Sequence, residues 1–129
     1  MGIGSYRDLK VWQEAMSVAE RAYRVTAPFP KEEAYGMTSQ IRRAAVSIAA
    51  NVAEGYGRDN SGSFVQFLRM SQGSLKELET HLILSARVSL VPTADVEPLL
   101  QQCDELGKML RSLIRSIQRR QSSDQDQGS

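Results

Sequence analysis

The stretch QIRRAAVSIAANVAEGYG, residues 40–57, decides the fold. On a helix drawn at 100° per residue, its apolar and polar side chains fall into two adjoining stripes. The apolar stripe contains Ile41, Ala45, Ile48 and Val52, and the polar stripe contains Gln40, Ser47, Asn51 and Glu54. Up to Glu54, most remaining positions are alanine or valine, so this helix is apolar around most of its circumference, whereas a surface helix needs only one apolar face. The pattern predicts a helix with neighbours on several sides.

The composition limits the class of protein. A chain of 129 residues fits one domain and can bury a core without disulfides or metal. With 16 basic and 15 acidic residues, its net charge of +1 gives little overall attraction for nucleic acid or an anionic membrane. The single cysteine, Cys103, excludes a disulfide or zinc cluster within one chain, and we interpret it as a small buried hydrophobe. Neither a membrane span nor a signal-peptide core is present, so a soluble cytoplasmic protein is expected.

Apolar seams with helical spacing mark three further segments. A helix expected to start near Asp8 carries the seam Leu9, Trp12, Met16, Ala19, Tyr23 and Thr26. A helix expected to be capped by Ser61 carries Phe64, Leu68, Ser71, Leu75, Leu78, Leu82 and Ser85. Beside it runs a second seam, Phe67, Met70, Ser74, Glu77, His81, Leu84 and Val88. The last helix, after Thr93, carries Val96, Leu99, Cys103, Leu106, Leu110, Leu113 and Ile117. Steps alternating between three and four residues are typical of helices in a left-handed bundle.

Four such helices with short connections predict an all-α, antiparallel, up-down-up-down four-helix bundle over residues 1–120. The polar segment 121–129 is expected to be a disordered tail. The apolar circumference of the 40–57 helix and the second seam of the next helix exceed what one bundle needs. Self-association is the simplest account, with small residues such as Gly73 and Ser74 at the contacts.

Six segments carry a resemblance to a known family. They are YRDLKVW at 6–12, FPKEEAYG at 29–36, QIRRAAVSI at 40–48, NVAEG at 51–55, FVQFL at 64–68 and GSLKELET at 73–80. They resemble the bacterial four-helix bundle proteins first described as encoded by intervening sequences in 23S ribosomal RNA genes. The last helix matches that family by pattern alone.

The resemblance implies a ring-shaped homopentamer of antiparallel four-helix bundles. The family has no established catalytic residues to carry over to this chain. A relative, the accessory protein of diversity-generating retroelements, has the same architecture and works with a reverse transcriptase and nucleic acid. That relative is markedly basic, whereas this chain has a net charge of only +1.

Two sets of side chains are candidates for function. The polar set contains Gln40, Ser47, Asn51, Glu54, Ser74 and Glu77. It could line a ligand site or a central pore, but the favoured interpretation is a hydrogen-bond network that fixes helix register, because buried polar groups are almost always paired. The basic set contains Arg42, Arg43, Arg58, Arg69 and Lys76, which could bind nucleic-acid phosphates if an oligomer brings copies together.

The last helix carries a separate basic group. Its members are Lys108, Arg111, Arg115, Arg119 and Arg120, with no acid between residues 105 and 120. For this group and for the basic set, the favoured interpretation is a solvated surface together with cations near the negative ends of helices.

No catalytic site, metal site or cofactor is predicted, because the chain has no nucleophile–base pair, phosphate loop or metal-ligand cluster. Bundle di-iron sites use two Glu-x-x-His motifs, whereas Glu77 and the only histidine, His81, are four residues apart. A Glu77–His81 hydrogen bond is expected instead. Two hypotheses follow: a non-enzymatic structural or adaptor homo-oligomer with a protein partner, or a nucleic-acid-binding accessory protein that could act with a reverse transcriptase.

Overall fold

The computed structural model describes residues 4–128, and the side chains of residues 4–123. Its elements are η1 (Tyr6–Asp8), α1 (Lys10–Thr26), η2 (Lys31–Glu33), α2 (Met37–Tyr56), α3 (Ser61–Arg87) and α4 (Thr93–Gly128). No β-strand occurs within residues 4–128. Each long helix packs against its neighbours in chain order, and α4 returns to pack against α1. The chain is therefore all-α with four long helices, consistent with a four-helix bundle.

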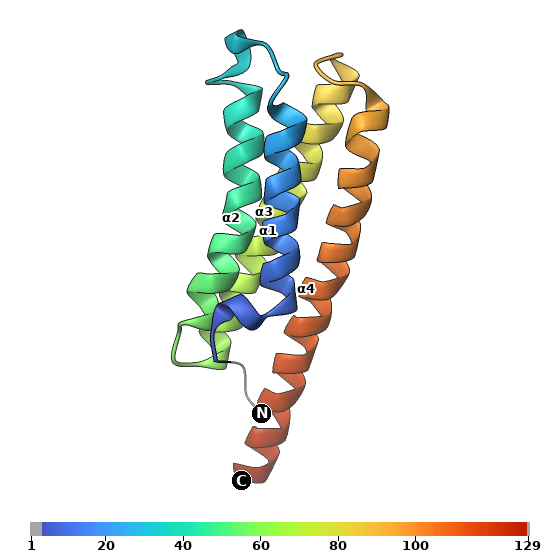
Figure 1. Cartoon of the computed structure of the whole chain (residues 1–129). Coiled ribbons are helices and arrows are strands. Elements are labelled where there is room, and N and C mark those ends of the chain that lie inside the picture. Colours follow the sequence, from blue (N-terminus) through green and yellow to red (C-terminus); the bar gives the residue numbers. More distant parts are fainter. Residues whose placement is uncertain (1–3, 129) are drawn as a thin grey trace.

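The connections lie at the two ends of the molecule. Figure 1 shows the α1–α2 and α3–α4 connections at one end, and the α2–α3 turn and η1 at the other. α4 is the longest helix, and its C-terminal part projects beyond the other three (Figure 1). Its outer surface is therefore accessible over a greater length than that of any other helix.

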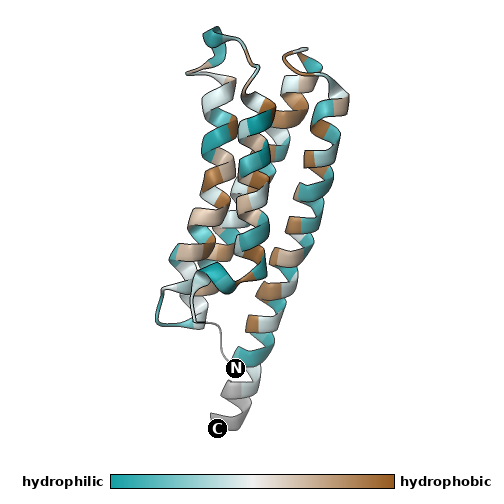
Figure 2. Cartoon of the chain, viewed as in Figure 1, coloured by the Kyte–Doolittle hydropathy of each residue, from teal (hydrophilic) through white to brown (hydrophobic). Residues whose placement is uncertain are grey.

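The core confirms most of the predicted seams. All four residues of the apolar stripe on α2 are fully buried, and so are Leu68, Leu78 and Leu82 on α3. On α4, Cys103, Leu106 and Leu110 are fully buried, and the hydrophobic residues recur turn by turn along the helix (Figure 2). Burying large aliphatic side chains contributes roughly 1.5–3 kcal/mol each, so these seams dominate the stability of the bundle.

The predicted seam of α1 is partly wrong. Leu9, Ala19 and Thr26 are buried, but Met16 is 37% exposed and Tyr23 is 46% exposed. The stripe that enters the core instead contains Val11, Ala15, Val18 and Ala22. Two stripes on α1 have helical spacing, and the core takes the one with smaller side chains, which lets α1 approach its neighbours closely. Trp12 is only partly buried, at the edge of the core.

Two helix starts differ from the sequence prediction. Asp8 does not begin α1, because η1 intervenes and Leu9 precedes the helix without a side-chain cap. At α3 the cap is Asn60, whose Oδ1 accepts a hydrogen bond from the Ser63 amide at 2.8 Å. An asparagine caps as well as a serine, so the helix starts one residue earlier than a Ser61 cap would allow.

The C-terminal segment also differs from the prediction. α4 continues as a helix through residues 121–128, where a disordered tail was expected, and residue 129 lies outside the described residues. An established helix gains one hydrogen bond for each residue added, and no proline interrupts this segment. Extension of the helix therefore needs no apolar contact.

Candidate interaction surfaces

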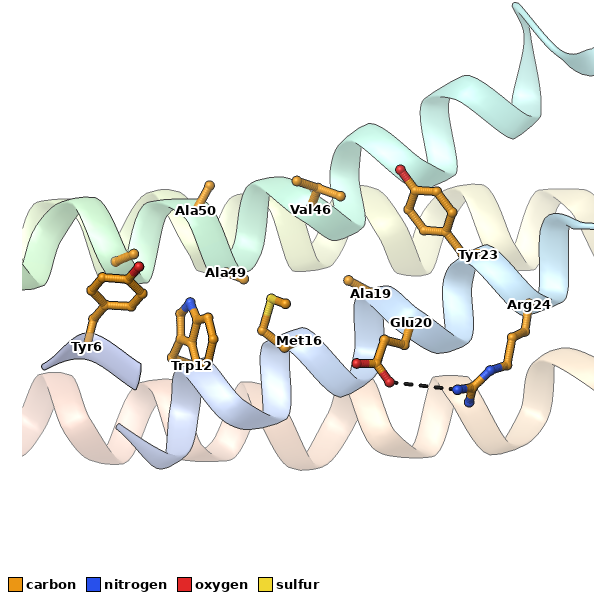
Figure 3. A pocket seen from close by; sticks show the side chains of 11 residues that line it. Tyr6, Trp12, Met16, Ala19, Glu20, Tyr23, Arg24, Val46, Ala49 and Ala50 are labelled. Carbon is orange, nitrogen blue, oxygen red and sulfur yellow. Dashed lines mark ion pairs between the residues drawn. The ribbon is translucent and has the colours of Figure 1, made fainter. Parts of the chain in front are cut away.

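An open apolar groove of about 600 Å³ runs between α1 and α2. It is lined by Tyr6, Trp12, Met16, Ala19, Glu20, Tyr23, Arg24, Val46, Ala49, Ala50 and Ala53. Trp12 and Met16 project from α1 toward Ala49 of α2, with Tyr6 at one end of the row and Tyr23 at the other (Figure 3). The groove arises because α1 turns its small side chains to the core and leaves its large ones beside the alanines of α2.

An ion pair and an aromatic contact border the groove. At one rim, Arg24 Nη2 lies 3.8 Å from Glu20 Oε2, and both side chains are largely exposed (Figure 3). Such exposed pairs contribute little to stability. At the η1 end, the rings of Tyr6 and Trp12 pack edge to face at 5.4 Å between centroids. The sequence contained a signal for this site, because the large side chains assigned to the α1 seam are the ones that line the groove.

A second apolar surface lies on α3. Met70 is 49% exposed and Val88 is 56% exposed, and Ile83 and Leu84 are exposed as well. Met70, Leu84 and Val88 belong to the second seam predicted for this helix. Its other members are half-buried or, like Glu77, exposed. The second seam therefore lies at the surface of the single chain, and we call its exposed apolar residues, Met70, Leu84 and Val88, the α3 surface.

Three residues of the polar set meet between α2 and α3. Ser47 Oγ and Ser74 Oγ are 2.8 Å apart, and Asn51 Nδ2 donates to the Ser47 carbonyl oxygen at 2.9 Å. Close by, Ser71 Oγ donates to the Ile48 carbonyl oxygen at 2.9 Å in the core. The Ser47–Ser74 and Ser71–Ile48 bonds join α2 to α3 at a fixed register, and the Asn51 bond lies within α2.

Two further members of the polar set adjoin that cluster without joining its hydrogen bonds. Gln40 and Glu77 are exposed and, with Arg43, Ala44 and Ser47, line a pocket of about 430 Å³. Glu54 instead pairs with Arg58 one turn later, at 2.7 Å between Oε1 and Nη2.

Arg42, predicted as a phosphate ligand, is half-buried and contacts the end of α1. Its Nε donates to Thr26 Oγ1 at 2.9 Å, and its Nη2 donates to the Tyr23 carbonyl oxygen at 3.4 Å. Its guanidinium also lies 4.5 Å from the centroid of the Tyr23 ring. A cation at the C-terminal end of a helix satisfies free carbonyl groups, so Arg42 fastens the end of α1 to α2.

The rest of the basic set does not form one open patch. Arg58 pairs with Glu54 and stacks 4.8 Å from the centroid of the Phe67 ring. Lys76 Nζ lies 3.0 Å from Glu79 Oε1. Arg43 lines the pocket that contains Gln40 and Glu77, and Arg69 is exposed on α3.

Two titratable groups, Cys103 and His81, reach into the interior. Burial, with Glu79 nearby, raises the pKa of the Cys103 thiol to about 12, which keeps it protonated at neutral pH. His81 Nε2 is buried without a hydrogen bond and Glu77 is exposed, so the expected Glu77–His81 bond is not formed by that nitrogen. Among the described residues no group of three or more His, Cys, Asp and Glu could hold a metal ion.

The helices are also unsuited to crossing a bilayer. None of those in the described part of the chain combines the length and the apolar character that a membrane span needs.

Comparison with known proteins shows which family and which solved structure this chain resembles. Residues 7–112 match the profile of the 23S rRNA-intervening sequence protein family. A crystal structure from Bacteroides thetaiotaomicron, of a protein of unknown function from the S23 ribosomal protein family, is similar in fold, with a TM-score of 0.72. The two sequences are 24% identical, and the match covers 81% of this chain and 97% of that one. No curated protein matches this chain significantly. Because the family profile spans α1 to α3 and most of α4, this chain belongs to the 23S rRNA-intervening sequence protein family.

Proposed function

We propose that this protein is a non-enzymatic, cytoplasmic scaffold: an antiparallel four-helix bundle that assembles into a homo-oligomeric ring and presents that ring to a protein partner. The number of subunits, five, follows from the family resemblance described above. The single observation that carries the proposal is the pair of different apolar surfaces on one chain, the α1–α2 groove and the α3 surface.

The two surfaces suit a ring because of its symmetry. A cyclic assembly of more than two subunits needs a heterologous contact, in which one surface of a subunit meets a different surface of the next. Monomers seldom leave large contiguous apolar patches in water. The groove offers a depression rimmed by Trp12, Met16 and Tyr23, and the α3 surface offers protruding side chains such as Met70 and Leu84. A second copy of the chain is therefore the occupant that fits the groove.

Nucleic-acid binding through the predicted basic set has less support. Arg42, Arg58 and Lys76 each make an intramolecular contact with a carbonyl, hydroxyl or carboxylate oxygen. Binding a phosphate would require those contacts to be replaced.

Native mass spectrometry of the chain at micromolar concentration tests the proposal. We expect a species near five times the chain mass of 14.3 kDa. The groove variant Met16→Glu/Val46→Glu should dissociate to monomers, because it places two charges in the apolar contact. The matched control Ala94→Glu/Gln101→Glu adds two carboxylates at exposed positions on α4 and should keep the parent mass. A parent chain that is monomeric at these concentrations would refute the ring.

A further inference from the structure

A continuous basic row lies along the outer side of α4. Its residues line a surface hollow of about 260 Å³ and are Lys108, Arg111, Ser112, Arg115 and Arg119. All five are exposed. The four basic residues, Lys108, Arg111, Arg115 and Arg119, are spaced three or four residues apart and therefore occupy one side of the helix. We call Arg111, Arg115 and Arg119 the arginine row.

The charges of this segment are largely uncompensated. Residues 106–123 contain five basic residues and no acid, whereas the whole chain has a net charge of only +1. The positive charge of the molecule is therefore concentrated here, and the remainder of the chain is net negative. Lys108 pairs with Asp104 at 3.4 Å, but among the described residues the arginine row makes no ion pair or hydrogen bond.

The helix dipole does not explain the row. A cation near the C-terminal end of a helix is stabilised by the dipole only within about the last turn. α4 continues to Gly128, so Arg111 and Arg115 lie several turns before its end. If α4 ended near residue 120, these cations would lie close to its negative end and the helix dipole could account for them. Because α4 is longer, that interpretation does not hold for Arg111 and Arg115.

The spacing of the row fits a linear polyanion. Four residues of α-helix advance about 6 Å along the axis, so the three guanidinium groups recur at regular steps of that order. A guanidinium group can donate two hydrogen bonds to the oxygens of one phosphate, and it stays positively charged at any physiological pH. A nucleic-acid strand presents phosphates at similarly regular, short intervals, and such contacts need no particular base sequence.

We propose that the arginine row binds the phosphate backbone of a single nucleic-acid strand laid along α4. A membrane surface fits less well, because a helix lying in a bilayer interface needs an exposed apolar face. The opposite side of this part of α4 is buried, with Leu110, Ile114 and Ile117 in the core. The large hydrophobic side chains exposed in the described part of the chain are all on other elements. The row is complete within one chain, so this inference does not depend on ring assembly.

Fluorescence anisotropy with a labelled 20-nucleotide single-stranded RNA tests the inference, with a DNA of the same length as a second probe. The parent chain should bind both, with an affinity that falls steeply between about 50 and 200 mM salt. The variant Arg111→Gln/Arg115→Gln/Arg119→Gln should bind at least about tenfold more weakly at the lower salt, since the loss of one ordinary charged contact already produces about that change. Its slope of log affinity against log salt should be smaller by about two.

The control variant Arg21→Gln/Lys31→Gln/Arg87→Gln removes three exposed charges elsewhere and has the same net charge. It should bind like the parent. Circular dichroism and native mass spectrometry of each variant show separately whether the fold and the assembly are intact. If both variants bound RNA equally weakly, net charge alone would account for the effect, and the inference would be overturned. An absence of salt-dependent binding by the parent, or binding to phosphatidylserine vesicles that the RNA does not displace, would overturn it as well.

Discussion

Ser89, in the α3–α4 turn, adopts a backbone conformation that is unfavourable for serine. It has a φ of 65° and is the only non-glycine residue with positive φ in the described part of the chain. The turn closes α3 with two hydrogen bonds, from the Leu90 amide to the Ser85 carbonyl oxygen at 2.9 Å and from the Ser89 amide to the Ala86 carbonyl oxygen at 3.1 Å. This is the Schellman arrangement, in which glycine usually occupies the left-handed position.

Ser89→Gly should therefore stabilise the protein by about 1 kcal/mol, because glycine removes the steric cost of the Cβ atom at positive φ. The change can be measured as an increase in the unfolding free energy in urea. The matched substitution Ser112→Gly, at an exposed position within α4, should instead destabilise by about 0.5 kcal/mol. Destabilisation by both substitutions would show that the turn does not hold Ser89 in this conformation.

Burial of Cys103 makes the stability of the protein depend on pH in the alkaline range. Its pKa is raised from 9.0 to about 12 by burial and by Glu79. Between those pH values the unfolded chain loses a proton that the folded chain keeps, so the stability falls as the pH rises. The loss should approach about 1.4 kcal/mol per pH unit in this window. We expect the unfolding free energy of Cys103→Ala, although lower at neutral pH, to fall less steeply than that of the parent from pH 9 to 11. Parallel curves for the two proteins would contradict the assignment.

At the scale of the elements, α2 and α3 approach each other closely at Gly55 and not at Gly73. Gly55 looks like a helix stop and Gly73 like a point of close approach between helices. In the structure Gly55 is buried, and a Cβ atom there would lie 2.6 Å from Phe67 Cβ and 3.0 Å from Phe64 Cδ1. A Cβ atom at Gly73 would meet nothing within 4 Å. α2 and α3 are thus in close contact beside their shared turn, where Gly55 faces two aromatic residues.

Alanine at the two positions should have opposite effects. Gly55→Ala should destabilise the protein by about 1–3 kcal/mol, because the added methyl group must force α2 and α3 apart. Gly73→Ala should stabilise it by up to about 1 kcal/mol, because alanine is the better helix former and the space is open. Thermal melts of both variants, with masses recorded in parallel, measure these effects. A lower mass for Gly73→Ala would instead place a neighbouring subunit against that glycine.

At the scale of the whole molecule, the proposed ring predicts a specific result for mixed variants. The groove variant keeps an intact α3 surface, and an α3-surface variant, Met70→Glu/Leu84→Glu, keeps an intact groove. Each alone should be monomeric, because every contact in a ring uses both surfaces. Mixing them should give a one-to-one complex of twice 14.3 kDa by native mass spectrometry. A mixture that stays monomeric, or an α3-surface variant with the parent mass, would exclude a contact between these two surfaces.

The sequence by itself determined the helices and most of the core. Ile48 on α2, Leu78 on α3 and Leu110 on α4 were recognisable as core residues and are fully buried. Their positions could be predicted because helical periodicity is a local property, repeated over many turns, and because the cost of exposing these side chains allows only one face to be buried. The polar set was interpreted from the sequence as a hydrogen-bond network that fixes helix register, but the sequence did not predict which of its members pair across α2 and α3.

The tertiary structure decided what periodicity leaves open. α1 has two stripes of equal spacing, and only packing against the other helices selects the one with Ala15 and Val18, which leaves Met16 and Tyr23 in the groove. Arg42 and Arg115 look alike in sequence, yet one is held against Thr26 and the other faces solvent. The physical reason is the same in both cases. The distance between helices, set by the side chains of all four together, determines which stripe is buried and which charges find a partner.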